Sequence, residues 1–201
     1  MIIKRTANAG VLIKTENISI LLDGVCEELL PYEKTPNDIK EELILAPPHI
    51  IAFSHRHKDH YSSAFANSIQ SIVITPESEK KNFAELGFFS VETRHIGKND
   101  VKHQSFVFEG EKCVWFMGDA SPVCLEKLKT FKKPDVLIVP YAYAITKSAW
   151  EKSLNLGAEK IILLHMPKKE MDEMKLWKTV EGVTEGEKSL IIPAIGETII
   201  L

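Results

Sequence analysis

The chain has 201 residues, of which 44% are hydrophobic and 26% are charged, as in an ordinary globular protein and unlike a disordered chain. A formal net charge of −3 argues against broad, non-specific nucleic-acid binding, which needs a basic surface. The three cysteines lack CxxC spacing, and the first ten residues lack the apolar stretch of a signal peptide. We therefore expect one cytoplasmic domain over residues 1–201, with no disulfide framework and no membrane segment.

The first elements in the chain read as β-strands. Residues 11–13 and 18–22 are rich in aliphatic and β-branched side chains, and the second run ends at Asp23 and Gly24. Residues 27–48 are acidic and contain four prolines, which predicts a loop with at most short helices.

The central part of the chain predicts buried strands. The apolar runs "IIAF" at residues 50–53 and "SIVIT" at residues 71–75 have the length and composition of such strands. Thr75 and Pro76 suit the start of a helix, which we expect over residues 77–86 and before a glycine.

Strands and helices alternate in the C-terminal half. A capping-box pair, Ser148 and Glu151, predicts a helix that ends near Gly157. The remaining patterns predict strands at residues 88–95, 104–109, 112–119, 135–140 and 160–165, a short helix at 122–131, and two strands within 189–201. This mixture indicates sheets covered by helices, and it excludes a helical bundle or an all-β barrel.

The segment "HRHKDH", which starts at His55, follows the apolar run "IIAF" directly. Alternate side chains of an extended segment point the same way, so His55, His57 and Asp59 are expected to share one side. A turn after Lys58 would bring His60 beside Asp59. Imidazole and carboxylate groups at this density are ligands for first-row metals, with zinc the default and iron or manganese as alternatives.

Two further candidate ligands stand at the ends of apolar runs. Asp119 follows "KCVWFMG", and His165 follows "KIILL". A single histidine that ends a buried strand is usually structural, but strand ends on one sheet edge are where α/β proteins build their sites. Because both residues accompany the HxHxDH segment, we expect them to join it.

The order of these motifs resembles that of the metallo-β-lactamase superfamily of metal-dependent hydrolases, and most closely its small cytoplasmic branch. The motifs are LLDG at residues 21–24, HxHxDH, an isolated histidine, GDAS at residues 118–121 and a late strand-end histidine. The resemblance covers about residues 18–165. It implies an α/β (α+β) fold, a four-layer αββα sandwich of two facing mixed β-sheets with helices on both outer sides.

The resemblance also implies two divalent metal ions. The implied ligands are His55, His57 and a mid-chain histidine for the first ion, Asp59, His60 and His165 for the second, and Asp119 between them. His95, which ends a strand as in some relatives, is the preferred mid-chain ligand, and His103 is the alternative. Asp23 would orient a ligand, or would only form the turn before Gly24.

The activity that the resemblance implies is hydrolysis by a hydroxide that bridges the two ions, with Asp59 accepting a hydrogen bond from that hydroxide. The substrate would be a small, anionic molecule with an ester- or phosphodiester-type bond; the chain has no basic insertion that would grip a nucleic acid. Tyr141 and Tyr143 would contact this substrate, or would simply pack at a strand end. The alternative function is a non-catalytic metal-binding or scaffolding protein of the same fold. We also expect the loop at residues 27–48 to overhang the site.

Overall fold

The computed structural model describes residues 1–98 and 100–201, and its strands form two mixed six-stranded sheets. The first sheet has the order β12-β1-β2-β3-β4-β5, in which β3, β4 and β5 are parallel and the other neighbours are antiparallel. Its strands are β1 (Ile2–Arg5), β2 (Val11–Lys14), β3 (Ser19–Leu22), β4 (Ile50–Ala52), β5 (Ile72–Ile74) and β12 (Thr198–Ile200).

The second sheet has the order β11-β10-β9-β8-β7-β6. Strands β8 to β11 are parallel, whereas β6, β7 and β8 pair antiparallel. Its strands are β6 (Phe88–Arg94), β7 (Lys102–Glu109), β8 (Cys113–Phe116), β9 (Val136–Pro140), β10 (Lys160–Leu164) and β11 (Leu190–Ile191).

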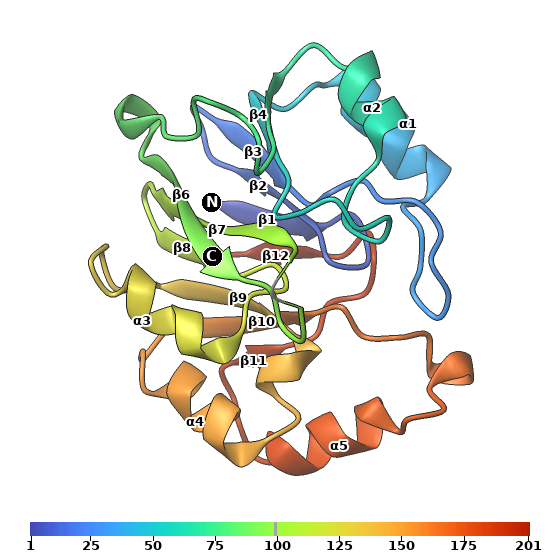
Figure 1. The fold of residues 1–201 in the computed structure, drawn as a ribbon, viewed down its shortest axis with the longest axis vertical. Helices are drawn as coiled ribbons and strands as arrows, with labels where there is room; N and C mark the ends of the chain where they lie inside the picture. The colour runs from blue at the N-terminus through green and yellow to red at the C-terminus, as the bar shows by residue number, and fades with distance from the viewer. Residues whose placement is uncertain (99) are drawn as a thin grey trace.

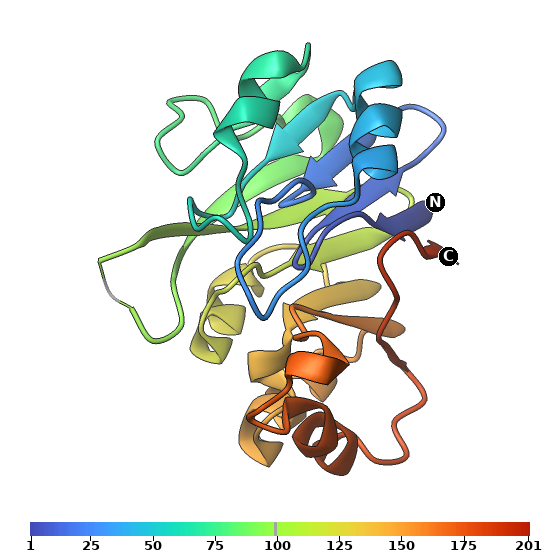
Figure 2. The ribbon, with the colours of Figure 1, turned by 90° about the vertical axis from the view of Figure 1, so that its right-hand side faces the viewer.

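Helices cover the outer faces of both sheets, as Figures 1 and 2 show. Helices α1 (Asn37–Leu45) and α2 (Ser63–Ser68) pack on the first sheet, and α3 (Leu125–Leu128), α4 (Lys147–Leu154) and α5 (Leu176–Val183) pack on the second. Four 3-10 turns complete the fold: η1 (Ala84–Leu86), η2 (Pro122–Cys124), η3 (Tyr141–Tyr143) and η4 (Lys169–Met171). The four-layer αββα sandwich expected from the sequence is confirmed.

Alternate side chains of the strands serve different layers. In β3, Ile20 and Leu22 point into the core between the sheets, whereas Leu21 points toward the helices of the first sheet. In β9, Ile138 joins the central core and Leu137 joins the core under α3, α4 and α5. Both faces of these strands are therefore buried, which explains why their sequences are continuous apolar runs.

The prediction of a helix over residues 77–86 is wrong. Thr75 and Ser78 close a turn instead, in which the Thr75 N–H donates to Ser78 Oγ at 2.9 Å, and only the 3-10 turn η1 follows. Residues 77–82 supply no apolar face that a helix could bury, and short helices depend on such packing.

The start of α4 also differs from the prediction. Thr146 caps this helix by accepting the Ala149 N–H, whereas Ser148 lies inside the helix. Strand β1 and helices α2 and α5 were not anticipated, because each is short and β1 and α2 bury few apolar side chains.

The carboxyl ends of β3, β4, β6, β8, β9 and β10 meet at one edge of the sandwich. The parallel pairs β3–β4 and β8–β9–β10 fix this for each sheet, and β6 runs parallel to β8 because both are antiparallel to β7. The segments that carry the candidate ligands follow these ends, so the topology itself assembles them.

Candidate metal centre

The first group of candidate ligands consists of three imidazoles. His55 and His57 follow β4, His95 follows β6, and their ligand atoms lie within 4.8 Å of one another. His55 Nε2 lies 2.9 Å from His57 Nδ1, and the His55 and His95 ring centroids are 4.7 Å apart. His57 is the half-exposed member, so this group faces the outside through His57.

The second group contains Asp59, His60 and His165, which also place their ligand atoms within 4.8 Å of one another. His165 Nε2 lies 3.0 Å from Asp59 Oδ2, and His60 Nε2 lies 3.9 Å from the same oxygen. All three residues are buried, and His165 comes from the far end of the second sheet.

Asp119 lies between the two groups. Its Oδ2 atom is 3.7 Å from His95 Nε2, 3.4 Å from His60 Nε2 and 3.6 Å from His165 Nε2. The carboxylate therefore reaches one imidazole of the first group and two of the second, which joins the groups into one centre.

Asp23 supports this centre through contacts with His60 and Ser54. Its Oδ2 atom lies 2.8 Å from His60 Nδ1, and its Oδ1 accepts the Ser54 N–H at 2.6 Å. The Ser54 hydroxyl also bonds to Asp23 and lies 2.9 Å from His55 Nδ1. A carboxylate on Nδ1 of a histidine leaves Nε2 free to bind a metal and fixes the plane of the ring.

Several ring nitrogens in the centre have no hydrogen-bond partner among the described residues. They are Nε2 of His60, Nε2 of His95 and both nitrogens of His165. Buried polar atoms in native proteins are rarely left unpaired, so these nitrogens need a partner from outside the chain. Imidazole nitrogens that surround carboxylate oxygens form a donor set that suits zinc, iron or manganese. The residues therefore fit a metal-binding site.

His103, the alternative mid-chain ligand, lies behind Asp119. Its Nε2 accepts the Asp119 N–H at 3.0 Å, and its Nδ1 lies 2.8 Å from Thr93 Oγ1. Burial lowers the pKa of His103 to about 3, so its imidazole stays neutral and can accept this hydrogen bond. By contrast, His95 Nδ1 bonds to the Ile96 carbonyl at 2.6 Å, and its Nε2 faces the centre. The structure thus brings His95, and not His103, together with the first group.

The surroundings favour the metal-binding protonation states of His55 and Asp119. Burial, together with the neighbouring His60, lowers the pKa of His55 far below its usual range, so its imidazole is neutral. Burial alone would raise the pKa of Asp119, but the imidazoles of His165 and His60 hold it well below its usual value. Neutral imidazole and ionised carboxylate are the forms that bind metals.

Three backbone positions near the centre, Asp23, His165 and Gly118, have a positive φ. His165 has φ +65°, in the left-handed region, and its N–H donates to the Asn8 carbonyl at 3.1 Å. Gly118 has φ +53°, and a Cβ there would lie 2.6 Å from Ser54 Oγ and 3.0 Å from His103 Nε2. Strain of this kind is typical of functional sites, where the surrounding contacts enforce it.

A tyrosine that sequence reasoning missed, Tyr32, lies against the centre. Its ring meets that of His165 edge-on with centroids 4.3 Å apart, and the Tyr141 ring lies 5.9 Å from the same imidazole. Burial, the neighbouring Tyr141 and the carboxylates of Asp119 and Asp59 raise the pKa of Tyr32, so its hydroxyl remains protonated. Tyr32 belongs to the loop at residues 27–48, and the expectation that this loop overhangs the site was the only signal that could have found it.

Tyr143, Tyr141 and His49 lie as follows. Tyr143 is fully buried in the core under α3, α4 and α5, and its hydroxyl has no partner within the described chain. Because Tyr143 is fully buried, its side chain cannot contact a substrate in this structure. Tyr141 is half-buried and lies beside the centre. His49 is exposed and bonds to Ser19, away from the site.

Residues 3–156 match the family described as "Beta-lactamase superfamily domain". Among solved structures, a possible metal-dependent hydrolase from Veillonella parvula DSM 2008 is similar with 17% identity over 100% of this chain and 99% of that chain, at a TM-score of 0.73. An isothiocyanate hydrolase from Delia radicum gut bacteria is similar to the same degree, with 17% identity over 100% of this chain and 99% of that chain, at a TM-score of 0.73.

A more distant similarity is to CmlA, a diiron β-hydroxylase from Streptomyces venezuelae, with 12% identity over 100% of this chain and 54% of that chain, at a TM-score of 0.57. At these identities the likeness concerns the fold. Among curated proteins, none matches the chain.

Proposed function

The chain belongs to the β-lactamase superfamily, whose family model matches more than half of its residues, and from this premise we propose that it is a dinuclear metal-dependent hydrolase of ester- or phosphodiester-type bonds. The superfamily assignment and the enzyme class expected from the sequence are confirmed by this match. The number of ions, their identity and the bond that is cleaved are the parts that we add as a proposal.

One observation carries the proposal: a single carboxylate oxygen of Asp119 lies 3.4–3.7 Å from imidazole nitrogens of both ligand groups. His55, His57 and His95 would hold one ion, and Asp59, His60 and His165 the other, with Asp119 shared. Zinc is the first choice for this donor set, with iron or manganese as alternatives.

Two such ions would lower the pKa of a water molecule toward neutrality and polarise the substrate oxygen. The chain's own groups would position the reactants. Asp59, whose Oδ2 lies 3.0 Å from His165 Nε2, would accept a hydrogen bond from the attacking water and direct its lone pair at the substrate. Tyr32, with its protonated hydroxyl beside His165, would donate a hydrogen bond to the oxygen on which charge develops.

The test combines metal content with turnover. We expect about two ions per chain by elemental analysis, together with hydrolysis of bis(p-nitrophenyl) phosphate or p-nitrophenyl acetate. His57→Ala should lose this hydrolysis and the ion that His55, His57 and His95 would hold. The control is His49→Ala, because His49 is exposed and, among the described residues, its side chain bonds only to Ser19.

Full metal loading without turnover of any phosphodiester, ester or isothiocyanate would instead support the non-catalytic alternative. Isothiocyanates enter the panel because one protein with this fold is named for their hydrolysis.

We further propose a small-molecule substrate and a cytoplasmic location for the whole unit of residues 1–201. The location is supported by three cysteines, Cys26, Cys113 and Cys124, that are buried and unpaired. Within the described residues, no helix has the length and apolar character needed to cross a membrane.

A further inference from the structure

A groove of about 420 Å³ opens beside the metal centre. The loop before α1 forms one wall, and the segment between β10 and α5 forms the other. The two walls are joined, because the Lys168 N–H donates to the Pro31 carbonyl at 3.1 Å. We call this hollow the Tyr32 groove; its main lining residues are Leu30, Pro31, Tyr32, Tyr141, Met171 and Met174.

The Tyr32 groove adjoins the metal centre through two aromatic side chains. Tyr32 and Tyr141 line the groove, and both rings also lie against His165, at centroid distances of 4.3 and 5.9 Å. A substrate whose reacting bond sits at His165 would extend its remainder past these two rings toward the groove.

The lining is apolar and carries no positive charge. Leu30 is 58% exposed, Met171 39% and Met174 77%, so three large apolar side chains are open to solvent around one groove. The lining contains no lysine or arginine, and its two acidic residues are Asp172 and Glu173. The Asp172 carboxylate is already engaged by the first N–H groups of α5, at 2.8 and 2.9 Å.

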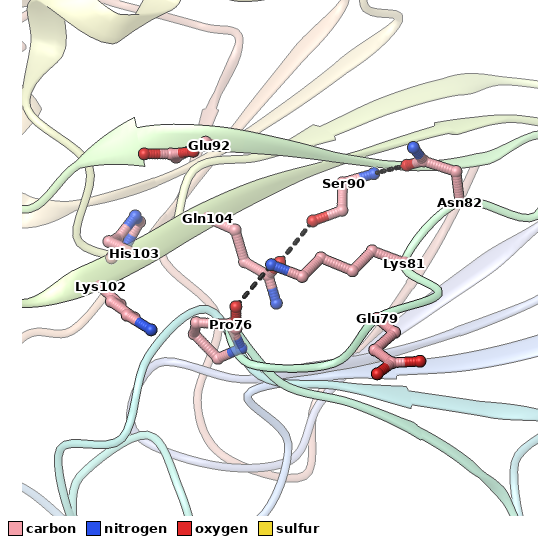
Figure 3. Close-up of a pocket in the computed structure, with 9 residues that line it drawn as sticks. All are labelled: Pro76, Glu79, Lys81, Asn82, Ser90, Glu92, Lys102, His103 and Gln104. Carbon is pink, nitrogen blue, oxygen red and sulfur yellow. Dashed lines mark hydrogen bonds between the residues drawn. The ribbon is translucent and has the colours of Figure 1, made fainter.

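The chain also has a polar hollow, of about 430 Å³, on the side of β6 and β7, and Figure 3 shows its lining. Lys81 and Lys102 line it, but Lys81 donates to the Pro76 carbonyl, and both ring nitrogens of His103 are engaged elsewhere. This hollow offers no free group of the metal centre to a ligand. Lys81 and Lys102 thus line a hollow whose lining contains none of the preferred metal ligands, whereas the apolar groove adjoins His165.

We propose that the Tyr32 groove binds an uncharged, apolar chain of the substrate, so that the enzyme prefers neutral esters with such a chain. This inference rests on the proposed hydrolase function, and it replaces the expectation of an anionic substrate. Burial of one methylene group is worth about fourfold in affinity, so four methylenes buried even in part give about tenfold or more.

The first test measures kcat/KM of the zinc-loaded protein by pH-stat titration with four esters. Ethyl hexanoate and hexyl acetate carry the added chain on opposite sides of the ester, so either placement is detected. We expect at least one of them to exceed ethyl acetate by about tenfold. Monoethyl adipate, which matches the hexanoate in length but ends in a carboxylate, should lose this advantage.

Two leucine variants give the matched comparison. Leu30→Glu places a charge in the groove, and the ratio of long-chain to short-chain kcat/KM should fall toward one. Leu45→Glu makes the same change at an 85% exposed position at the end of α1, outside the groove, and should keep the wild-type ratio.

A binding measurement keeps the inference testable without turnover. N-hexylacetamide, a neutral amide, should shift the NMR signals of the Met171 and Met174 methyl groups in the zinc-loaded protein and leave Met1 unchanged. If no ester is hydrolysed but these methyl signals shift, the proposed function is wrong, whereas the proposal that the groove binds an apolar chain is retained. Equal rates for all four esters, or the absence of methyl shifts, would overturn the proposal that the groove binds an apolar chain.

Discussion

Replacement of Asp23 by asparagine tests how the metal centre is held. Asp23 is fully buried and accepts hydrogen bonds from the Ser54 N–H and hydroxyl, and its Oδ2 lies 2.8 Å from His60 Nδ1. Asparagine keeps the shape but has one oxygen, so its NH2 group must face a donor. His60 can avoid this clash only by moving its proton to Nε2, the nitrogen that faces the centre.

The magnitude follows from this loss. Removing the carboxylate partner of a metal-binding histidine costs about 10–100-fold in metal affinity, or about 1.4–2.8 kcal/mol. We expect the effect on the ion held by His60, so Asp23→Asn should retain one tight ion and bind the second about 10–100-fold more weakly. A buried donor facing a donor should also cost about 1–3 kcal/mol of folding stability.

The assay is competition of the metal-free protein with a chromogenic zinc chelator, together with thermal unfolding. The matched control is Asp38→Asn, because Asp38 is exposed on α1 and its carboxylate bonds only to the next backbone N–H. If Asp23→Asn bound two ions with wild-type affinity, the role of Asp23 in orienting His60 would be refuted.

Three further predictions concern the same centre. His95→Ala should bind about one ion per chain by elemental analysis, whereas His103→Gln should keep two, and the reverse result would exchange their roles. Gly118→Ala should lower stability by about 2 kcal/mol or more, or about 4–8 °C in Tm by calorimetry, because the added carbon would lie 2.6 Å from a neighbouring side-chain oxygen at a positive φ; an unchanged Tm would contradict this. Removal of metal by a chelator should lower Tm by about 8 °C or more, since an ion present at 1,000 times its Kd stabilises the fold by about 4 kcal/mol, and a Tm insensitive to chelation would argue against a built site.

The parts of the centre that could be predicted from sequence are those fixed by local geometry. His55, His57, Asp59 and His60 lie within six residues after a buried strand, so their convergence needs only the turn that follows β4. The position of His165 was predictable because carboxyl ends of parallel strands share an edge.

The choice between His95 and His103 could not be made from the sequence. Both lie at the end of the β6–β7 hairpin, where Thr93 pairs with His103. Whether a ring there faces the candidate metal ligands or the Asp119 N–H depends on the position of β8, which no local pattern encodes.

The Tyr32 groove and the absence of the helix expected over residues 77–86 show two other features that could not be predicted from the sequence. Tyr32 reaches His165 because residues 29–32 are held by a contact with Lys168, more than a hundred residues away. The capping signals at Thr75 and Pro76 were real, but residues 77–82 have no apolar face to bury, so a turn formed instead.

The most direct test of the metal centre is anomalous X-ray diffraction from crystals of the metal-loaded protein at the zinc and iron edges. We predict two peaks, one bound by His55, His57 and His95, the other by Asp59, His60 and His165, with Asp119 between them. A single peak, no peak, or a peak bound by His103 would contradict the account.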